Sequence, residues 1–468
     1  MRKLYSEYER NVALFDTELR VSENFDILKK VLTVSGGELT LYFIDGFVKD
    51  TVMQKMMMHF LSQKSLAKSA TAYVRSSVPY VETDVSGDLD FMKQMILSGA
   101  TVLLGSSFGD EGIIIDTRTY PARDTEEPQG DRVMRGARDG FVETLIFNTA
   151  LIRRRIRDTA LTMKYITVGE STKTDIVVCY MNGKADEKYV SYIINKISSL
   201  KIRSLTLGAQ SLAESLIRTK WYNPFPKIRV TERPDAASAQ LLEGSVAVII
   251  DNTPEVMILP STIFDFMQET NDFYFPPLTS TYIRLVRYSV FFMTLIITPL
   301  WYLLISYPDL VPEWLSFILP QDKGRLPILF QLFLVEFMID ALRLASMNTP
   351  DMLANSLSVV GGLILGDFAV EIGWLIPEVI LYMAFVAIAN FTQRSYQLGY
   401  AFKFLRMFLL LTTGLFKLWG FIGGGVVILV LLATNKTVNG KRSYLYPVIP
   451  FNARALKTLL FRVKKKDI

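Results

Sequence analysis

Acidic residues set within apolar sequence are the side chains with the clearest chemical potential in this chain. Glu336 and Asp340 lie in the stretch 326–347, and Arg343 follows three residues later, so a helix would place all three on one face. Inserting a charged side chain at the centre of a membrane helix costs about 2.5–3.5 kcal/mol. We therefore expect these side chains to face protein or water and not lipid.

A second acidic pair lies in a glycine-rich apolar stretch, 356–374. Asp367 and Glu371 are four residues apart there. In the same stretch, Gly362 and Gly366 have the small-xxx-small spacing that lets two helices approach closely. This spacing fits helix packing between subunits and within one chain equally well.

Two interpretations of the four carboxylates stay open. Rings of carboxylates around a pore attract cations, which makes all four residues candidates for lining or gating a cation path. Alternatively, they pair with bases of the same chain, for example Asp340 with Arg343 or Arg394, and only fix the helix packing. The unpaired polarity of Glu336 and Asp340 makes these two the favoured face of a cation path.

The sequence offers little for catalysis or for a bound cofactor. A single histidine, His59, and a single cysteine, Cys179, cannot form a zinc site of Cys and His ligands, and a lone cysteine excludes an internal disulfide. The glycine-rich stretch 105–112 lacks the terminal Gly-Lys-Ser/Thr of a phosphate-binding loop. We therefore expect no enzyme, no cofactor and no metal.

Charge and apolar patterning together indicate a membrane protein. The formal net charge is +5, and many basic residues lie near the borders of apolar stretches, which argues against a nucleic-acid partner. We expect an α+β membrane protein whose cytoplasmic mixed α/β domain has two subdomains, 1–125 and 126–280. A helical transmembrane domain of four to six spans would follow at 281–440, and a basic cytoplasmic tail at 441–468.

The soluble part alternates between helix and strand signals. Apolar spacings near three and four predict a helix over 16–32 and a stronger one over 141–156. Two strands joined by a glycine-rich turn are expected within 100–118, and a hairpin-like pair within 245–260. We interpret the cluster 153–155, three arginines, as a solvated helix end in preference to an interaction patch for lipid or an acidic partner.

Five apolar stretches are candidate membrane spans, at 286–307, 326–347, 356–374, 376–391 and 407–434. The first has about 22 residues, roughly 33 Å of helix, which is enough to cross a bilayer core. The absence of a signal peptide and the basic tail favour both ends in the cytoplasm, which requires an even number of crossings. We prefer four, with 326–347 re-entrant or interfacial; the alternative is that 407–434 is a broken hairpin.

Several stretches resemble the GerA/SpoVAF family of spore germination membrane proteins from endospore-forming bacteria. The likeness covers about residues 35–435 in the family's order, and the first two stretches below are closer to the SpoVAF type than to the A subunit of nutrient germinant receptors. The stretches are LYFIDGFVKD (41–50), RGARDGFVETLIFNTALIRRRI (135–156), GSVAVIIDNTPEVMILP (244–260), ETNDFYFPPLTSTYIRLVRY (269–288) and SVVGGLILGDFAVEIG (358–373).

The resemblance implies a protein of the spore inner membrane that acts in germination, with its soluble domain on the cytoplasmic, spore-core side. It implies a homo-oligomeric ring, with pentamers expected from the receptor type, that conducts monovalent cations together with a small membrane partner. The resemblance supplies no catalytic positions. Two alternatives remain, an A-type subunit of a nutrient germinant receptor and a non-conducting membrane scaffold for germination complexes.

Overall fold

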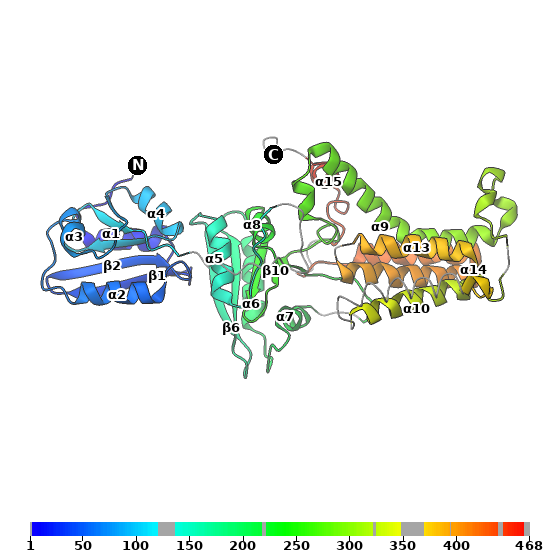
Figure 1. Ribbon diagram of the computed structural model, residues 1–468, viewed down its shortest axis with the longest axis horizontal. Helices are drawn as coiled ribbons and strands as arrows, with labels where there is room; N and C mark the ends of the chain where they lie inside the picture. The colour runs from blue at the N-terminus through cyan, green and yellow to red at the C-terminus, as the bar shows by residue number, and fades with distance from the viewer. Residues whose placement is uncertain are drawn as a thin grey trace. The chain divides into compact units, whose positions relative to one another are not determined.

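The structure, a computed structural model, describes residues 2–119, 136–217, 221–321, 324–347, 369–393, 395–438 and 443–462. The chain divides into two compact units (Figure 1). An α/β unit comprises Met1–Arg218 and Ile228–Pro260, and a helical unit comprises Thr219–Lys227 and Ser261–Ile468.

The α/β unit contains two five-stranded sheets in which every strand pair is antiparallel. The first sheet has the order β1-β2-β4-β5-β3, and the second has the order β6-β7-β9-β10-β8. The strands are β1 (Ile27–Val34), β2 (Gly37–Ile44), β3 (Thr83–Ser86), β4 (Thr101–Gly105), β5 (Gly112–Ile115), β6 (Leu161–Val168), β7 (Thr174–Met181), β8 (Arg229–Thr231), β9 (Val246–Ile250) and β10 (Val256–Leu259).

Helices cover the sheets and close their cores. On the first sheet, α1 and α4 pack on one face and α2 and α3 on the other. On the second sheet, α5 and α8 pack over a core that includes Cys179. The helices of this unit are α1 (Tyr8–Glu18), α2 (Asp50–Leu61), α3 (Ala70–Ser77), α4 (Leu89–Leu97), α5 (Leu145–Arg155), α6 (Glu187–Ser198), α7 (Gly208–Leu216) and α8 (Pro234–Leu242).

The two halves of the α/β unit repeat one topology. From α1 to β5, the described elements run helix, hairpin, two helices, strand, helix, hairpin, and the same order runs from α5 to β10. The strand order is also the same, since in each sheet the third strand lies at the edge beside the fifth. We infer that the halves arose by internal duplication, which sequence reasoning had missed.

Equivalent hydrogen bonds occur at the start of each half of the α/β unit. The amide side chain of Asn11 accepts a bond from the Tyr5 N–H (2.8 Å) and donates one to the Tyr5 carbonyl (2.7 Å). Asn148 does the same to the N–H (2.8 Å) and carbonyl (2.5 Å) of Val142. Both asparagines are buried and both reach back six residues, so each fixes the chain entering the first helix of its half.

In the described part of the helical unit, α9, α10, α13 and α14 run lengthwise beside one another (Figure 1). Its helices are α9 (Pro277–Ile305), α10 (Ile328–Met347), α12 (Ala369–Glu371), α13 (Pro377–Phe391), α14 (Tyr396–Thr434) and α15 (Ala453–Leu460), with short 3-10 turns η1 (Thr270–Phe273), η2 (Pro308–Leu310) and η3 (Glu313–Ile318). Among the described residues, two helices, α9 and α14, are long and apolar enough to cross a membrane. These two helices support a membrane domain, and the four to six spans expected from the sequence stay a prediction.

The helix α14 folds back on itself at Lys417. Lys417 has φ 51° and ψ −126°, which is not helical. A β-carbon on Gly424 would lie 2.9 Å from Leu409 Cδ1, although fifteen residues of straight helix would separate these positions by about 22 Å. Segments 396–416 and 418–434 therefore form a helical hairpin, the alternative that the sequence left open.

The two segments of this hairpin approach each other closely at Gly420, so the hairpin should require a residue without a side chain there. A β-carbon there would overlap the Thr412 carbonyl oxygen, whereas one on Gly423 would meet nothing within 4 Å. We expect Gly420→Ala to destabilise the helical unit by about 1–3 kcal/mol through overpacking. Thermal unfolding of the purified protein in detergent measures this, with Gly423→Ala as the matched control; equal Tm values for both variants would contradict the close approach.

The secondary structure confirms most sequence expectations of the soluble part and corrects one. Helix α5 and the hairpins β4–β5 and β9–β10 lie where the sequence predicted them. The helix expected over 16–32 is wrong, because α1 ends at Glu18 and β1 begins at Ile27. Apolar residues four apart, such as Leu28 and Leu32, share a face of a strand as well as of a helix, so the spacing alone was ambiguous.

Candidate functional site

The candidate site is a network of four charged side chains between α10 and α14. Glu336 and Asp340 lie one turn apart on α10, and Lys403 and Arg406 lie one turn apart on α14, so each helix presents its two charges to the other. Arg406 Nη2 donates to both Glu336 oxygens, at 2.7 and 2.8 Å. Lys403 Nζ lies 3.2 Å from Glu336 Oε1 and also binds Asp340. Lys403 therefore bridges the two carboxylates.

A third helix completes the network. Arg406 Nη1 donates to the Thr294 carbonyl of α9 at 3.3 Å. The Thr294 hydroxyl donates to the Phe291 carbonyl of the same helix at 2.6 Å. Arg406 thus ties α9 to α10 through α14.

Burial makes the network energetically important. The side chains of Arg406, Glu336 and Lys403 are only 2%, 7% and 7% exposed, and Asp340 is 32% exposed. Two carboxylates and two cations give a balanced charge, which offsets the desolvation cost of each group. Removing one partner would leave an uncompensated charge among apolar helices.

The structure places the sequence-predicted site residues unequally. It brings Glu336 and Asp340 together, but the expectation that their polarity is unpaired is wrong, because α14 supplies a base to each. Glu371 lies in α12 and is exposed. Asp367, Gly362, Gly366 and the proposed partner Arg394 lie outside the described residues.

Arg343, the other suggested partner of Asp340, lies among aromatic rings. Its guanidinium is 5.6 Å from the ring centroid of Phe391, 5.1 Å from that of Tyr396 and 5.5 Å from that of Tyr400. Such cation–π contacts contribute about 0.5–1 kcal/mol at exposed sites. Arg343 therefore docks α10 on the end of α13 and the start of α14.

Sequence reasoning missed Lys403 and Arg406, although a signal was present. Both bases interrupt the apolar run AFKFLRMFLLL at 401–411, with the spacing of three that puts them on one helix face. The candidate span was placed from residue 407 onward, so both bases fell outside it. Two basic residues three positions apart and two acidic residues four positions apart, each pair within apolar sequence, together predict a buried ion network.

A second buried ion network anchors the start of α9. Arg287 binds Asp272 at 2.8 and 2.9 Å and Glu269 at 2.7 Å, and Arg284 lies 3.3 Å from Asp272. Arg284 also donates to the Thr458 carbonyl of α15 at 3.3 Å. Both arginines lie inside α9 and hold it to η1 and α15.

Comparison with known proteins gives consistent similarities over nearly the full length. The family model for the Bacillus/Clostridium GerA spore germination protein matches residues 16–468. Stage V sporulation protein AF of Bacillus subtilis (strain 168) is 34% identical over 99% of this chain and 94% of its own length. The uncharacterized membrane protein YfkQ of the same organism is 30% identical over 90% of this chain and 82% of its own length.

Two further similarities are weaker. Spore germination protein KA of Bacillus subtilis (strain 168) is 26% identical over 97% of this chain and 84% of its own length. A crystal structure of the N-terminal domain of the A subunit of the Bacillus megaterium spore germinant receptor GerK3 is 21% identical, with a TM-score of 0.42, over 55% of this chain and 96% of that chain. In sequence the chain is therefore nearer to stage V sporulation protein AF than to spore germination protein KA.

Proposed function

The chain belongs to the GerA family of spore germination proteins, as its motifs predicted, and on this premise we propose that it is a cation channel acting in germination. The observation that carries the proposal is the network in which Lys403 bridges Glu336 and Asp340. Ionisable groups among membrane helices are costly, and they mark ion or proton pathways where they occur.

Lys403 would act as a tethered cation that closes the path. Its ammonium occupies the place between two carboxylates that a permeating K⁺ or Na⁺ would take. Asp340 is the most exposed member of the network, so it would be the point at which Lys403 is released. Displacement of Lys403 would free Asp340 for cations, while Arg406 stays bound to Glu336.

Assembly and topology extend the proposal. Continuous conduction would need several copies around a pore, so we propose a homo-oligomeric ring, completed by a small membrane partner, in the spore inner membrane.

The contact of Arg284 with α15 puts the start of α9 beside the C-terminal segment, where Arg454 and Lys457 are exposed. Basic residues favour the cytoplasmic side. Because α14 is a hairpin, its two segments count as two candidate crossings, and the number of candidate crossings rises from five to six. An even number supports both chain ends on the cytoplasmic side.

Flux through proteoliposomes tests the proposal. Glu336→Gln would turn the balanced network into a net positive one and repel cations, so we expect K⁺ and Na⁺ flux to fall by about tenfold or more. Asp309→Asn, an exposed carboxylate of η2 outside the network, is the matched control and should leave flux unchanged. Protein-dependent flux of equal size in Glu336→Gln and wild type would contradict the acidic path, and a scaffold predicts no protein-dependent flux in any variant.

A further inference from the structure

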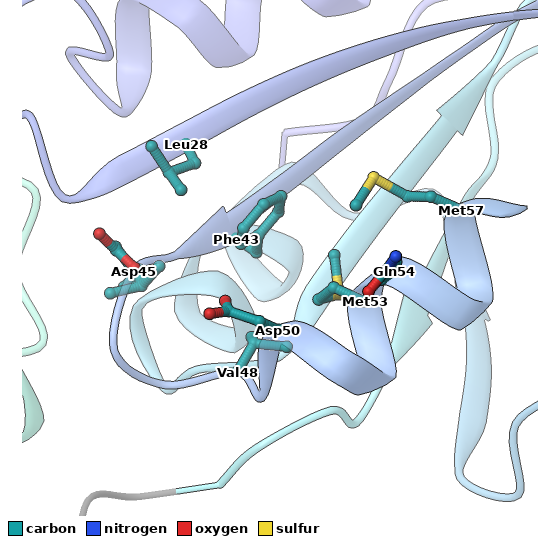
Figure 2. Close-up of a pocket in the computed structure, with 9 residues that line it drawn as sticks. Leu28, Phe43, Asp45, Val48, Asp50, Met53, Gln54 and Met57 are labelled. Atoms are coloured by element: carbon teal, nitrogen blue, oxygen red, sulfur yellow. The ribbon is translucent and has the colours of Figure 1, made fainter.

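A hollow that is partly open to solvent lies in the first half of the α/β unit. It has a volume of about 260 Å³ and lies between β1, β2 and α2. Figure 2 shows the carboxylates of Asp45 and Asp50 at one side of it and the side chains of Phe43, Met53 and Met57 around it. The cavity therefore combines an apolar lining with two acidic groups.

These two carboxylates have no cationic partner in the described part of the chain. Asp45 Oδ1 accepts a bond only from the N–H of the adjacent Gly46, at 3.0 Å. Burial is the largest cause that raises the pKa of Asp45; the bond from the Gly46 N–H lowers it, and the nearby carboxylates of Asp50 and Asp26 raise it further. Asp50 is exposed, so water solvates its charge, whereas Asp45 is half-buried. The negative charge of Asp45 in this partly apolar hollow is costly unless a cation compensates it.

The fold does not require this charge, as the duplicated half demonstrates. The Asp45 N–H donates to the Asp26 carbonyl directly after the β1–β2 pairing, and the Asn182 N–H donates to the Ala160 carbonyl at the same point after β6–β7, both at 2.8 Å. A glycine with positive φ follows each, Gly46 and Gly183. An asparagine therefore makes the same turn, and the carboxylate of Asp45 is additional to what the turn needs.

We propose that this cavity binds a compact organic cation, an ammonium compound with a short apolar substituent. Phe43 and the two methionines would contact the substituent, because an aromatic face and soft thioethers accommodate an alkylammonium better than a hydrated metal ion. No group of three or more potential metal ligands occurs among the described residues, which disfavours a divalent metal. The site is independent of the channel proposal, since it lies wholly in the α/β unit.

Binding of n-butylammonium to the full chain in lipid nanodiscs tests the proposal. Ligand-observed saturation-transfer NMR would give the Kd, with empty nanodiscs as background and n-butanol as the uncharged analogue. We expect saturable binding of n-butylammonium, no comparable binding of n-butanol, and a Kd about tenfold or more weaker in Asp45→Asn, because a charge-assisted hydrogen bond is lost. The asparagine at the equivalent turn indicates that this variant folds.

Two further variants separate the site from general surface charge. Asp84, on the edge strand β3 of the same sheet, is exposed and likewise accepts a bond from the next residue's N–H, at 2.8 Å, so Asp84→Asn should leave the Kd unchanged. Met57→Trp should abolish binding by filling the cavity while keeping both carboxylates. Equal Kd values for wild type and Asp45→Asn, equal binding of n-butanol, or competition by K⁺ at the same concentration as n-butylammonium would overturn the proposal.

Discussion

Replacing Arg153 by methionine is expected to destabilise the α/β unit by about 3–5 kcal/mol, because it strands a buried carboxylate. Arg153 is fully buried at the end of α5, and its guanidinium binds both oxygens of Asp26, at 2.8 and 3.0 Å. It also donates to the Leu161 carbonyl at 3.1 Å. Asp26 immediately precedes β1, so this ion pair joins the two duplicated halves of the unit.

The single cysteine of the chain provides the readout. Cys179 is fully buried in the same core cluster as Ile152, the neighbour of Arg153 on α5. Burial raises the pKa of its thiol, so the folded protein should react slowly with thiol reagents. An opening free energy reduced by about 3–5 kcal/mol should accelerate labelling of Cys179 by roughly 10²- to 4 × 10³-fold.

A double-mutant cycle distinguishes a lost ion pair from lost packing. Removing both charges in Asp26→Leu/Arg153→Met should restore most of the stability, because no unpaired charge is left buried. Arg154→Met, at the exposed neighbouring position, should change the labelling rate by less than about threefold. A double variant as unstable as Arg153→Met, or an Arg154→Met variant equally affected, would show that the pair is not what joins the halves.

The arginine cluster illustrates what the sequence could not resolve. Both interpretations of 153–155, a solvated helix end and an interaction patch, were wrong for Arg153 because its partner lies 127 residues earlier in the chain. Arg155 binds Asp139, and Arg154 is exposed. Three consecutive residues of a helix point about 100° apart and together cover about 200° of its surface, so one of them can face the core while the other two face solvent.

Local signals predicted local structure well, and pairing between distant segments poorly. The hairpins and α5 follow from turn residues and apolar spacing, whereas the duplication leaves no repeated motif that the sequence reading detected. Its trace is confined to single positions such as Asn11 and Asn148, whose bonds are recognisable only in three dimensions. In the candidate site, the acidic half was predicted from the cost of buried charge, and the basic half was missed because the span boundary was drawn beyond it.

Lys403→Gln is expected to have the largest effect on conduction, and in the opposite direction to Glu336→Gln. Removing the ammonium leaves Glu336 paired with Arg406 but deprives Asp340 of the one base that binds it in the described network. The network then carries a net negative charge. At an effective dielectric constant near 20, one unit charge about 4 Å from a cation contributes about 4 kcal/mol of attraction, so we expect K⁺ flux to rise by at least about tenfold.

Two matched lysine variants make the result specific to the bridge. Lys403→Arg keeps the positive charge and should stay close to wild type in flux. Lys417→Gln removes a lysine of the same helix that binds Ser306 at 3.2 Å, away from the network, and should not raise flux. Because Lys403→Gln removes the proposed closing group, it should conduct even if wild type is closed in liposomes. Flux absent in Lys403→Gln, with correct membrane insertion shown by protease protection, would therefore contradict the channel and favour a scaffold whose buried charges only hold α9, α10 and α14 together.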